Sequence, residues 1–483
     1  MNMPMKTLTF SIAAAVALFG CGKKEEPKPQ AAAPAAAPAA KPEVVVRIGH
    51  VAPLTGGIAH LGKDNENGAR LALDEANAKG MEIGGAKVRF ELVAEDDQAD
   101  PKVGTTVAQK LVDAKVAGIV GHLNSGTTIP ASAIYNQAGL PMISGSATNP
   151  KLTEQGFKNI FRTVGRDDQQ GPAVASYLMA QFKPKTIAVI DDATAYGEGL
   201  ANEVEKTLKS SGATVLPREK GTDKTTDWKA VLTKVKGKKP DAVFYGGMDA
   251  TGGPLLKQAR ELGIKATFAY GDGACTDKMQ ELAGESAEGL ICSQAGIPVQ
   301  AASKAFLDNY KKQFNMDPIL YGPFTYDSAG LLIAAMKKAE STDPAKYLPA
   351  LATISYQGAS GRIEFDDKGD RKDAEMTIFT MKGGKIEPIA IVKSGKTMSV
   401  DDYMKLAAGA ATEAMDAAKD AAKDAAKAAG EAVKAATQAA TAAGEAAKEA
   451  GKEGVKAAAD AVKETAEAVK ETAEKAKAAV EKK

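Results

Sequence analysis

The chain has 483 residues, and at about 100–200 residues per domain this length predicts more than one folding unit. Lys and Arg together number 62 and Asp and Glu 61, so no global positive field attracts nucleic acid or an anionic membrane. Only three histidines and three cysteines are present, which argues against a metal-rich or disulfide-rich protein.

The first 20 residues have the pattern of a secretory signal. An apolar run from Leu8 to Phe19 is too short to span about 30 Å of hydrocarbon, but it suits the core of a signal peptide. The following Gly20-Cys21 completes a string, LFGC, that resembles the lipobox of bacterial lipoproteins, although Phe19 is bulkier than usual. We therefore expect cleavage before a diacylated Cys21; the alternative is a plain signal peptide with an incidental cysteine. Gly22 in the next position favours export to the outer membrane.

Residues 21–43 are predicted to form a tether. The string GKKEEPKPQAAAPAAAPAAKPE at 22–43 is rich in Pro, which blocks helices, and offers little to bury. An extended, polyproline-like spacer is the expected result. Attached to a lipidated Cys21, it would hold the following domain away from the membrane surface.

Residues 44–403 alternate predicted strands and helices with short turns between them. The β-branched run 44–49 predicts a buried parallel strand, and 67–77 carries Ala and Leu at helical spacing. Further strands are predicted at 88–93, 116–120, 140–143, 186–190, 213–216, 242–245 and 267–270, and further helices at 101–113, 129–138, 197–210, 228–235 and 253–262. This alternation predicts an α/β fold with doubly wound parallel sheets. Because the segment is longer than one core comfortably serves, two lobes are expected.

Residues 404–483 form a tail of different composition. From 411 onward it contains no Trp, Tyr, Phe, Leu, Ile or Pro and consists mostly of Ala, Lys, Glu, Asp, Thr and Gly. These are mostly good helix formers, while Gly430, Gly444, Gly451 and Gly454 are expected to interrupt the helix, each at about 1 kcal/mol relative to Ala. Val455, Val462 and Val469 recur every seven residues, a weak coiled-coil seam. The tail is predicted to be helical or disordered; a solvated tail and one that self-associates or packs on an envelope surface both remain open.

Enzyme signatures are absent from the sequence. There is no Walker loop, HExxH, CxxC pair or GxSxG elbow, and the Gly pairs lack the spacing of a dinucleotide loop. His50, His60 and His122 have no Cys or Asp partner clustered by spacing. No catalytic residue, metal site or cofactor is therefore predicted.

Small polar residues follow several predicted strands, just before a helix. HLNSGTT (122–128) follows VAGIV, and SGSAT (144–148) follows LPMI. Free amides at a helix N-terminus, joined by Ser and Thr hydroxyls, suit a carboxylate. On the other predicted lobe, DDATAYG (191–197) and YGDG (270–273) occupy equivalent strand ends, where an acidic residue suits an ammonium. The alternative is that these residues only cap helices and turns.

A series of strings runs through the domain in a characteristic order: NGARLALDEANAKG (67–80), EDDQADPK (95–102), GHLNSGTTIPAS (121–132), PMISGSATNPKLT (141–153), FRTVGRDDQQGP (161–172), YGEGLA (196–201), FYGGMD (244–249), AGESAEGL (283–290) and GRIEFDDKGD (361–370). On these strings, residues 44–400 resemble the branched-chain amino-acid binding proteins of ATP-driven importers, the leucine/isoleucine/valine type of periplasmic solute receptor. The resemblance implies a type I, Venus-flytrap fold of two Rossmann-like lobes joined by three crossovers. The first lobe would span about 44–167 and 296–374, and the second about 168–295 and 375–403.

The resemblance also implies roles for individual residues. Ser125 and Thr148, with their backbone amides in the loop that includes Ala147, would hold a ligand carboxylate. The Ser146 carbonyl, the Thr148 hydroxyl and the Asp272 carboxylate would hold the α-ammonium. On the side-chain end, Tyr196 would close from the second lobe and Tyr321 would line the pocket.

Several positions depart from the leucine receptors. Leu61 and Met248 stand where those receptors often carry Tyr, and Asp272 replaces a longer Glu, so we expect a larger or more tolerant side-chain pocket that admits another aliphatic or an aromatic amino acid. Their disulfide would need Cys at 99 and 124, which are Ala and Asn here. Cys275 and Cys292 lie 17 positions apart instead. A bridge between them, bracing the loop of Asp272, is expected in an oxidising compartment, and two free buried thiols are the alternative.

The sequence thus predicts a non-enzymatic, lipid-anchored receptor in the envelope of a bacterium. It would capture an α-amino acid between two lobes and pass it to a membrane permease with paired ATPases, with no cofactor and no nucleic-acid partner. One rival is an envelope structural or sensory lipoprotein that reuses the receptor domain, with the tail as its interacting element. A dehydrogenase-like enzyme is a more distant alternative.

Overall fold

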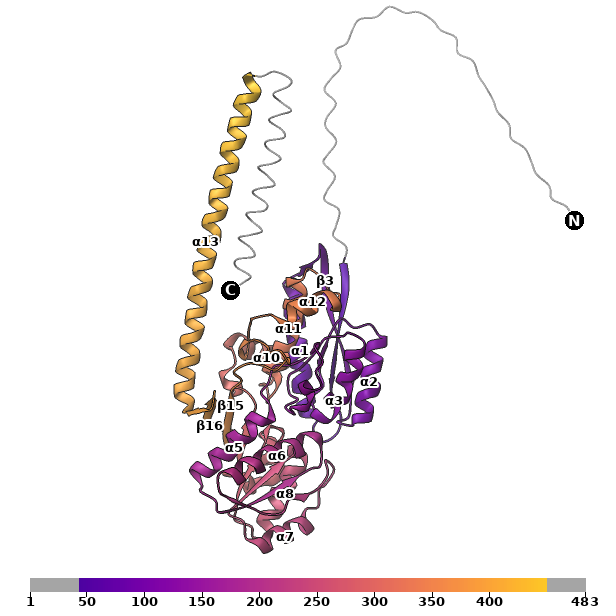
Figure 1. Cartoon of the computed structure of the whole chain (residues 1–483), viewed down its shortest axis with the longest axis vertical. Helices are drawn as coiled ribbons and strands as arrows, with labels where there is room; N and C mark the ends of the chain where they lie inside the picture. Colours follow the sequence, from indigo (N-terminus) through magenta and orange to yellow (C-terminus); the bar gives the residue numbers. More distant parts are fainter. Residues whose placement is uncertain (1–42, 450–483) are drawn as a thin grey trace, which may run out of the picture. The chain divides into compact units, whose positions relative to one another are not determined.

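A computed structural model describes residues 43–449 of the chain (Figure 1). The predicted signal peptide, Cys21, the tether and the tail beyond Glu449 lie outside the described residues. Within the described range, the helices and strands build two large sheets, a small hairpin and one long C-terminal helix.

The first sheet has six strands in the order β2-β3-β1-β4-β5-β6, all parallel except β2, which runs antiparallel to β3. Its strands are β1 (Glu43–Ala52), β2 (Glu82–Ile83), β3 (Ala86–Asp96), β4 (Ile119–Gly121), β5 (Met142–Ser144) and β6 (Ile160–Arg162). The helices along this part of the chain are α1 (Ala59–Ala78), α2 (Pro101–Asp113), α3 (Ser125–Gln137) and α4 (Lys151–Glu154). We call this sheet with its helices the first lobe.

The second sheet has nine strands, in the order β17-β16-β15-β12-β11-β10-β7-β8, with β9 pairing beside β7. Its strands are β7 (Thr186–Asp191), β8 (Thr214–Val215), β9 (Glu219–Lys220), β10 (Ala242–Gly246), β11 (Thr267–Tyr270), β12 (Ile291–Gln294), β15 (Met376–Lys382), β16 (Lys385–Lys393) and β17 (Lys396–Met398). Its helices are α5 (Asp167–Gln181), α6 (Ala195–Ser210), α7 (Lys229–Lys238), α8 (Asp249–Glu261) and α9 (Lys278–Ala283), with the short turns η1 (Asp272–Ala274) and η2 (Gly284–Ala287). We call this part the second lobe.

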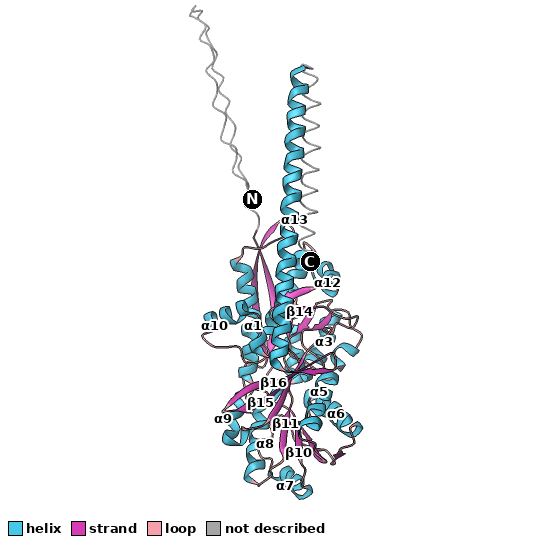
Figure 2. Ribbon diagram, turned by 90° about the vertical axis from the view of Figure 1, so that its left-hand side faces the viewer, coloured by secondary structure: helices cyan, strands magenta, loops and turns pink. Residues whose placement is uncertain are grey.

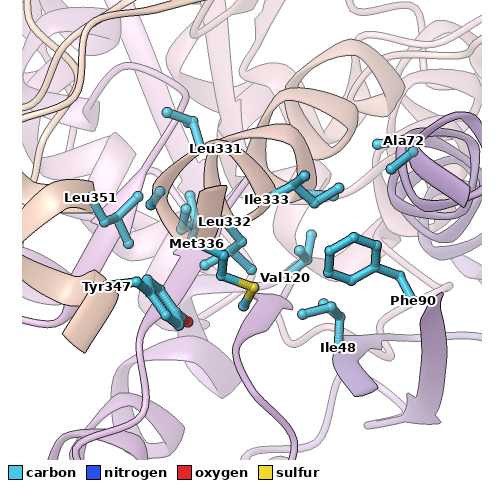
Figure 3. Close-up of a cluster of buried hydrophobic side chains, with 14 of the residues drawn as sticks. Ile48, Ala72, Phe90, Val120, Leu331, Leu332, Ile333, Met336, Tyr347 and Leu351 are labelled. Carbon is cyan, nitrogen blue, oxygen red and sulfur yellow. The ribbon is translucent and has the colours of Figure 1, made fainter. Parts of the chain in front are cut away.

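The chain returns to the first lobe after β12. This returning segment holds η3 (Val299–Ala301), α10 (Lys304–Phe314), α11 (Gly322–Lys338), α12 (Pro344–Ala352) and the hairpin β13 (Tyr356–Gly358) and β14 (Gly361–Ile363). Figure 3 shows the buried cluster that results, where Leu332 and Met336 of α11 meet Ile48 of β1 and Phe90 of β3. The core of the first lobe therefore combines segments almost 300 positions apart.

The predicted α/β fold is confirmed, but the sheets are not purely parallel. Strands β15, β16 and β17 add to β12 as an antiparallel meander. Gly383 and Gly384, both with positive φ, form the two-residue turn between β15 and β16, a turn that requires this backbone conformation. No strand is predicted from the sequence in this region, so the antiparallel edge corrects the prediction of purely parallel sheets.

Local sequence explains the best-predicted helices. The predicted helix 101–113 coincides with α2, where Asp100 accepts hydrogen bonds from the amides of Lys102 and Val103 and Pro101 occupies the first turn. By contrast, α1 begins at Ala59, eight residues before the predicted start at Asn67. Its first two turns bury mainly polar residues, with Leu61 as the single large apolar side chain among them, so no apolar periodicity marks them.

The C-terminal helix α13 spans Val400–Glu449 and is drawn as one continuous helix in Figure 2. Its first turns belong to the second lobe's packing, since Tyr403 is buried and its hydroxyl donates to Glu375 Oε1. The predicted boundary at 403/404 falls inside this helix. It also runs through Gly430 and Gly444, contrary to the expected interruptions, because the flanking Ala, Lys and Glu residues are strong helix formers. Among the residues described, no helix is long and apolar enough to cross a membrane.

Candidate ligand-binding site

The ligand-facing loops of the first lobe leave the carboxyl ends of β4 and β5. Ser125 begins α3, and its Oγ accepts a hydrogen bond from the amide of Asn149 at 3.2 Å. The Ser146 hydroxyl donates to the carbonyl of Leu123 at 3.2 Å and accepts from Asn65 Nδ2 at 3.1 Å. These bonds tie the two loops to each other and to α1. The four predicted residues on these loops are all buried: Ser125, Ser146, Ala147 and Thr148.

A buried arginine stabilises the second of these loops, which follows β5. Arg162 is fully buried, and its guanidinium donates to the carbonyls of Ala147 at 2.8 Å and Asn149 at 3.1 Å. Its Nε donates to Asp370 Oδ1 at 2.6 Å. Burial alone would raise the pKa of Asp370, but Arg162 and Arg166 outweigh it and hold that pKa below its usual value. The backbone on both sides of Thr148 is thereby immobilised by a charge-assisted network.

In the second lobe, the carboxylate of Asp272 is the centre of the site. It lies in the turn η1, directly after β11, and is buried. Oδ1 accepts from the Tyr196 hydroxyl at 2.8 Å and from Gln170 Nε2 at 3.0 Å, and Oδ2 accepts from the Tyr321 hydroxyl at 2.6 Å. Burial raises the pKa of Asp272, and the hydrogen bonds from Tyr321, Tyr196 and Gln170 offset only part of that rise.

Contacts between the lobes surround this centre. Tyr321 precedes α11 of the first lobe, so its bond to Asp272 joins the lobes. A second link joins His60 Nε2 of α1 and Asp249 Oδ2 of α8, which are 2.8 Å apart. A third runs from Asn149 Nδ2 to the carbonyl of Ala195 at 2.6 Å. The two lobes are therefore in direct contact across the site.

An apolar wall completes the site. Leu61 of α1 is fully buried in a cluster that includes Leu123, Leu320 and Tyr321, and the half-buried Met248 of the second lobe packs against it. An anionic group suits the α3 end of the site, a cationic group suits Asp272, and an apolar group suits this wall. All nine residues predicted for the ligand lie on the loops and helix ends that meet here.

A disulfide supports the turn of Asp272. The structure joins Cys275, which ends η1, to Cys292 of β12, and both are buried. Of the two alternatives left open by the sequence, the structure has the bridged form.

Sequence reasoning missed several residues of the site. The pair of His60 and Asp249 is separated by 189 positions, so spacing could not reveal it. His122 Nδ1 also has an Asp partner, Asp97 Oδ2, at 3.0 Å. The two residues are 25 positions apart in the sequence, which is too far for a local spacing pattern to reveal the pair. Gln170 stands inside the string RDDQQG, which carries the family resemblance, but the string gives no indication that its side chain reaches Asp272.

Comparison with known proteins agrees with this geometry. The family model described as periplasmic binding protein matches residues 45–385. The chain belongs to the periplasmic binding protein family. Among its relatives, the leucine-, isoleucine-, valine-, threonine- and alanine-binding protein of Pseudomonas aeruginosa is 35% identical over 337 residues, which cover 69% of this chain and 89% of the relative. The leucine-specific-binding protein of Salmonella typhimurium is 35% identical over 338 residues, 69% of this chain and 90% of the relative.

Solved structures of periplasmic binding proteins show the same fold. A leucine-binding protein from Thermotoga maritima superposes with a TM-score of 0.67 at 28% identity and covers 74% of this chain and 99% of that one. A branched-chain amino-acid transporter substrate-binding protein from Streptococcus pneumoniae, in complex with isoleucine, has a TM-score of 0.64 at 30% identity and covers 72% and 100%. The family match ends at residue 385, so the part of this binding protein after β15 lies outside it.

Proposed function

We propose that this chain is an extracytoplasmic solute receptor that binds an L-amino acid between its two lobes and delivers it to an ABC importer of the branched-chain amino-acid type. The arrangement of Asp272 carries the proposal, because this buried carboxylate faces the lobe interface where both lobes contribute polar groups. The relatives support the same class of ligand, since their names specify leucine, isoleucine, valine, threonine and alanine, and the Streptococcus structure contains isoleucine.

In this proposal the polar groups bind the α-carboxylate and the α-ammonium, which all amino acids share. Ser125 and Thr148, with the free amides at the start of α3, hold the carboxylate. The Ser146 carbonyl, the Thr148 hydroxyl and Asp272 hold the ammonium, and Tyr196 closes from the second lobe. The raised pKa of Asp272 supports this role, because a ligand cation stabilises a carboxylate that burial otherwise disfavours.

The apolar wall would read the amino-acid side chain. Leu61, Met248 and the ring of Tyr321 offer an aliphatic surface with one aromatic member. A branched-chain ligand, or a related apolar or aromatic one, fits this chemistry. A charged ligand side chain would be left without a partner on this wall and would be disfavoured by several kcal/mol.

Cellular placement follows from the N-terminal sequence. We propose that Cys21 carries a lipid anchor and that residues 21–43 tether the receptor to a membrane, with the outer membrane favoured. Residues 404–483 would form an added segment that ligand capture does not need. Palmitate labelling of the wild-type chain, lost in Cys21→Ala, tests the anchor; labelling that persists in Cys21→Ala would overturn it.

Calorimetric titration tests the receptor function. Residues 22–483, refolded to remove any carried-over ligand, are titrated with each of the twenty L-amino acids. We expect one-to-one binding of an aliphatic or aromatic amino acid, and a loss of at least 100-fold in affinity for Asp272→Ala and Ser125→Ala. Asp223→Asn, an exposed carboxylate of the same lobe, is the matched control and should bind normally. A folded wild-type protein that binds none of the twenty would refute the proposal.

A further inference from the structure

One carboxylate of the first lobe is buried without a cation beside it. Asp64, in the second turn of α1, is 1% exposed and accepts five hydrogen bonds. Oδ1 accepts from the Tyr310 hydroxyl at 2.8 Å and the Ile319 amide at 3.0 Å. Oδ2 accepts from the amides of Leu320 at 2.9 Å, Tyr321 at 2.8 Å and Gly322 at 2.8 Å. No Lys, Arg or His among the described residues forms an ion pair with Asp64 within 4.0 Å, so these donors alone offset its desolvation.

Four consecutive amides converge on this single side chain. Residues 319–322 connect α10 to α11, and Gly322 is the first residue of α11. The negative charge of Asp64 therefore sits at the N-terminus of a helix on another element, where the helix dipole favours it. Because each of the four amides points at the same carboxylate, the connection cannot rotate without breaking several bonds at once.

Close backbone approach reinforces the arrangement. A Cβ added at Gly68 of α1 would lie 2.2 Å from the carbonyl oxygen of Gly322, and one added at Gly322 would lie 2.9 Å from Asp64 Oδ1. Both positions therefore require glycine for α1 and α11 to approach this closely. The distance from Asp64 to the connection is thus fixed by the packing of the two helices.

The connection held by Asp64 carries a residue of the ligand site. The Tyr321 amide donates to Asp64 Oδ2, and the Tyr321 hydroxyl donates across the lobes to Asp272 Oδ2 at 2.6 Å. Within the same turns of α1, His60 contacts Asp249 and Asn65 contacts the Ser146 hydroxyl. The part of α1 that holds Asp64 therefore contacts three residues around the site: Tyr321, Asp249 and Ser146.

We infer that Asp64 is a positioning residue for ligand capture. It holds the backbone of residues 319–322 so that the Tyr321 hydroxyl reaches Asp272, and through Tyr321 it sets both the affinity and the stability of the closed lobes. This inference rests on the proposed receptor function. It differs from a merely structural role in one respect: the effect of Asp64 on binding must pass through the Tyr321 hydroxyl.

A double-mutant cycle on the otherwise full chain, residues 22–483, separates the two roles, with L-leucine as the calorimetric probe. Tyr321→Phe removes only the hydroxyl. We expect Asp64→Asn to weaken leucine binding at least tenfold in the wild-type background and less than twofold in the Tyr321→Phe background. An equal loss in both backgrounds would overturn the inference and leave Asp64 as a structural residue.

A buried carboxylate of similar design supplies the control. Asp327 of α11 accepts from the amides of Ala359 at 2.6 Å and Ser360 at 2.8 Å, but these belong to the β13–β14 turn rather than to the site. Asp327→Asn should lower stability in the same way as Asp64→Asn, with an equal and small effect on leucine binding in both backgrounds. A Tyr321-dependent effect of Asp327→Asn would contradict the assignment.

A milder change covers the case in which Asp64→Asn does not fold. Tyr310→Phe removes one of the five donors and leaves the carboxylate in place. We expect a two- to fivefold loss of leucine affinity that disappears in the Tyr321→Phe background; a loss that persists there overturns the inference. If the wild-type chain does not bind leucine, the cycle is run with the amino acid that the titration identifies; if none of the twenty binds, the proposed function fails together with this inference. If it binds leucine without coupling between the two positions, only the inference fails.

Discussion

In the first lobe the ligand-facing loops are held by buried ionic groups, whereas in the second lobe the Asp272 turn is held by hydroxyl groups and a disulfide. Arg162 donates hydrogen bonds to two carbonyls of the loop that contains Thr148. Asp64 accepts hydrogen bonds from four amides of the connection that contains Tyr321. Asp272 instead receives uncharged donors and stands three residues before Cys275. In the proposed receptor, the first lobe would therefore present a rigid half-site and the second lobe would supply the carboxylate that closes on the ligand.

The largest expected effect comes from breaking the ionic network of the first lobe. Arg162→Met leaves Asp370 buried beside a single remaining guanidinium, so we expect the free energy of unfolding to fall by about 3–5 kcal/mol. Urea denaturation of the full chain measures it. Arg362→Met removes an exposed arginine that pairs with Glu364 and should change stability by less than about 1 kcal/mol. Equal losses of stability in the two variants would show that the buried network contributes no more to the free energy of unfolding than an exposed ion pair.

The second lobe is tested through its disulfide. Cys275→Ser/Cys292→Ser opens a loop of 17 positions, for which chain entropy predicts a loss of about 3 kcal/mol in stability. Because Cys275 ends the turn of Asp272, we also expect amino-acid affinity to fall several-fold. Reduction of the wild-type protein should reproduce both changes. If the double variant keeps full affinity, the disulfide does not position Asp272 and the comparison of the lobes must be revised.

The two lobes are also expected to differ in how their stability responds to low pH. His50, on β1 of the first lobe, is fully buried, and this burial lowers its pKa from 6.5 to about 4. Between these values the folded state binds fewer protons than the unfolded state, so stability is retained above pH 6.5 and lost as the pH falls toward 4. This histidine alone accounts for about 2 kcal/mol between pH 7 and pH 5. Urea denaturation at pH 7 and pH 5 should show that the free energy of unfolding of His50→Gln falls by about 2 kcal/mol less than that of the wild type.

The location of that acid effect provides its own check. Protection factors of amide hydrogen exchange, which correct for the intrinsic pH dependence, should fall between pH 7 and pH 5 in β1 and β4 of the first lobe, since His50 Nδ1 bonds to the carbonyl of Val120 at 3.0 Å. Protection factors in β10 and β11 of the second lobe should change less. An equal fall in the two sheets would argue against a lobe-specific origin.

The smallest effect is expected from the tail. Deleting residues 409–483 retains Tyr403 and Ala407, which pack against the second lobe, and removes the rest of α13 with the segment after it. Amino-acid affinity measured by calorimetry should stay within twofold of the full chain. A larger loss would show that the tail contributes to capture, and would add a third element to the comparison of the lobes.

The contrast between the lobes also explains what the sequence could predict. Polar loops after β4, β5 and β11 were predicted because strand ends and turn residues are local signals, and the ordered strings carried the family resemblance. Arg162 and Asp64 were not assigned roles, because their partners lie 208 and up to 258 positions away and depend on the return of the chain to the first lobe. The first turns of α1 were missed for a related reason: they bury polar side chains, which periodicity interprets as exposed.

Both sheets also end in very short strands. The outermost strands of the first sheet, β2 and β6, have two and three residues, and those of the second, β8 and β17, have two and three. An edge of this length offers few unpaired amides and carbonyls, so another chain has little to pair with. The two large sheets, which hold fifteen of the strands in the described residues, therefore end in strands that resist strand-to-strand aggregation.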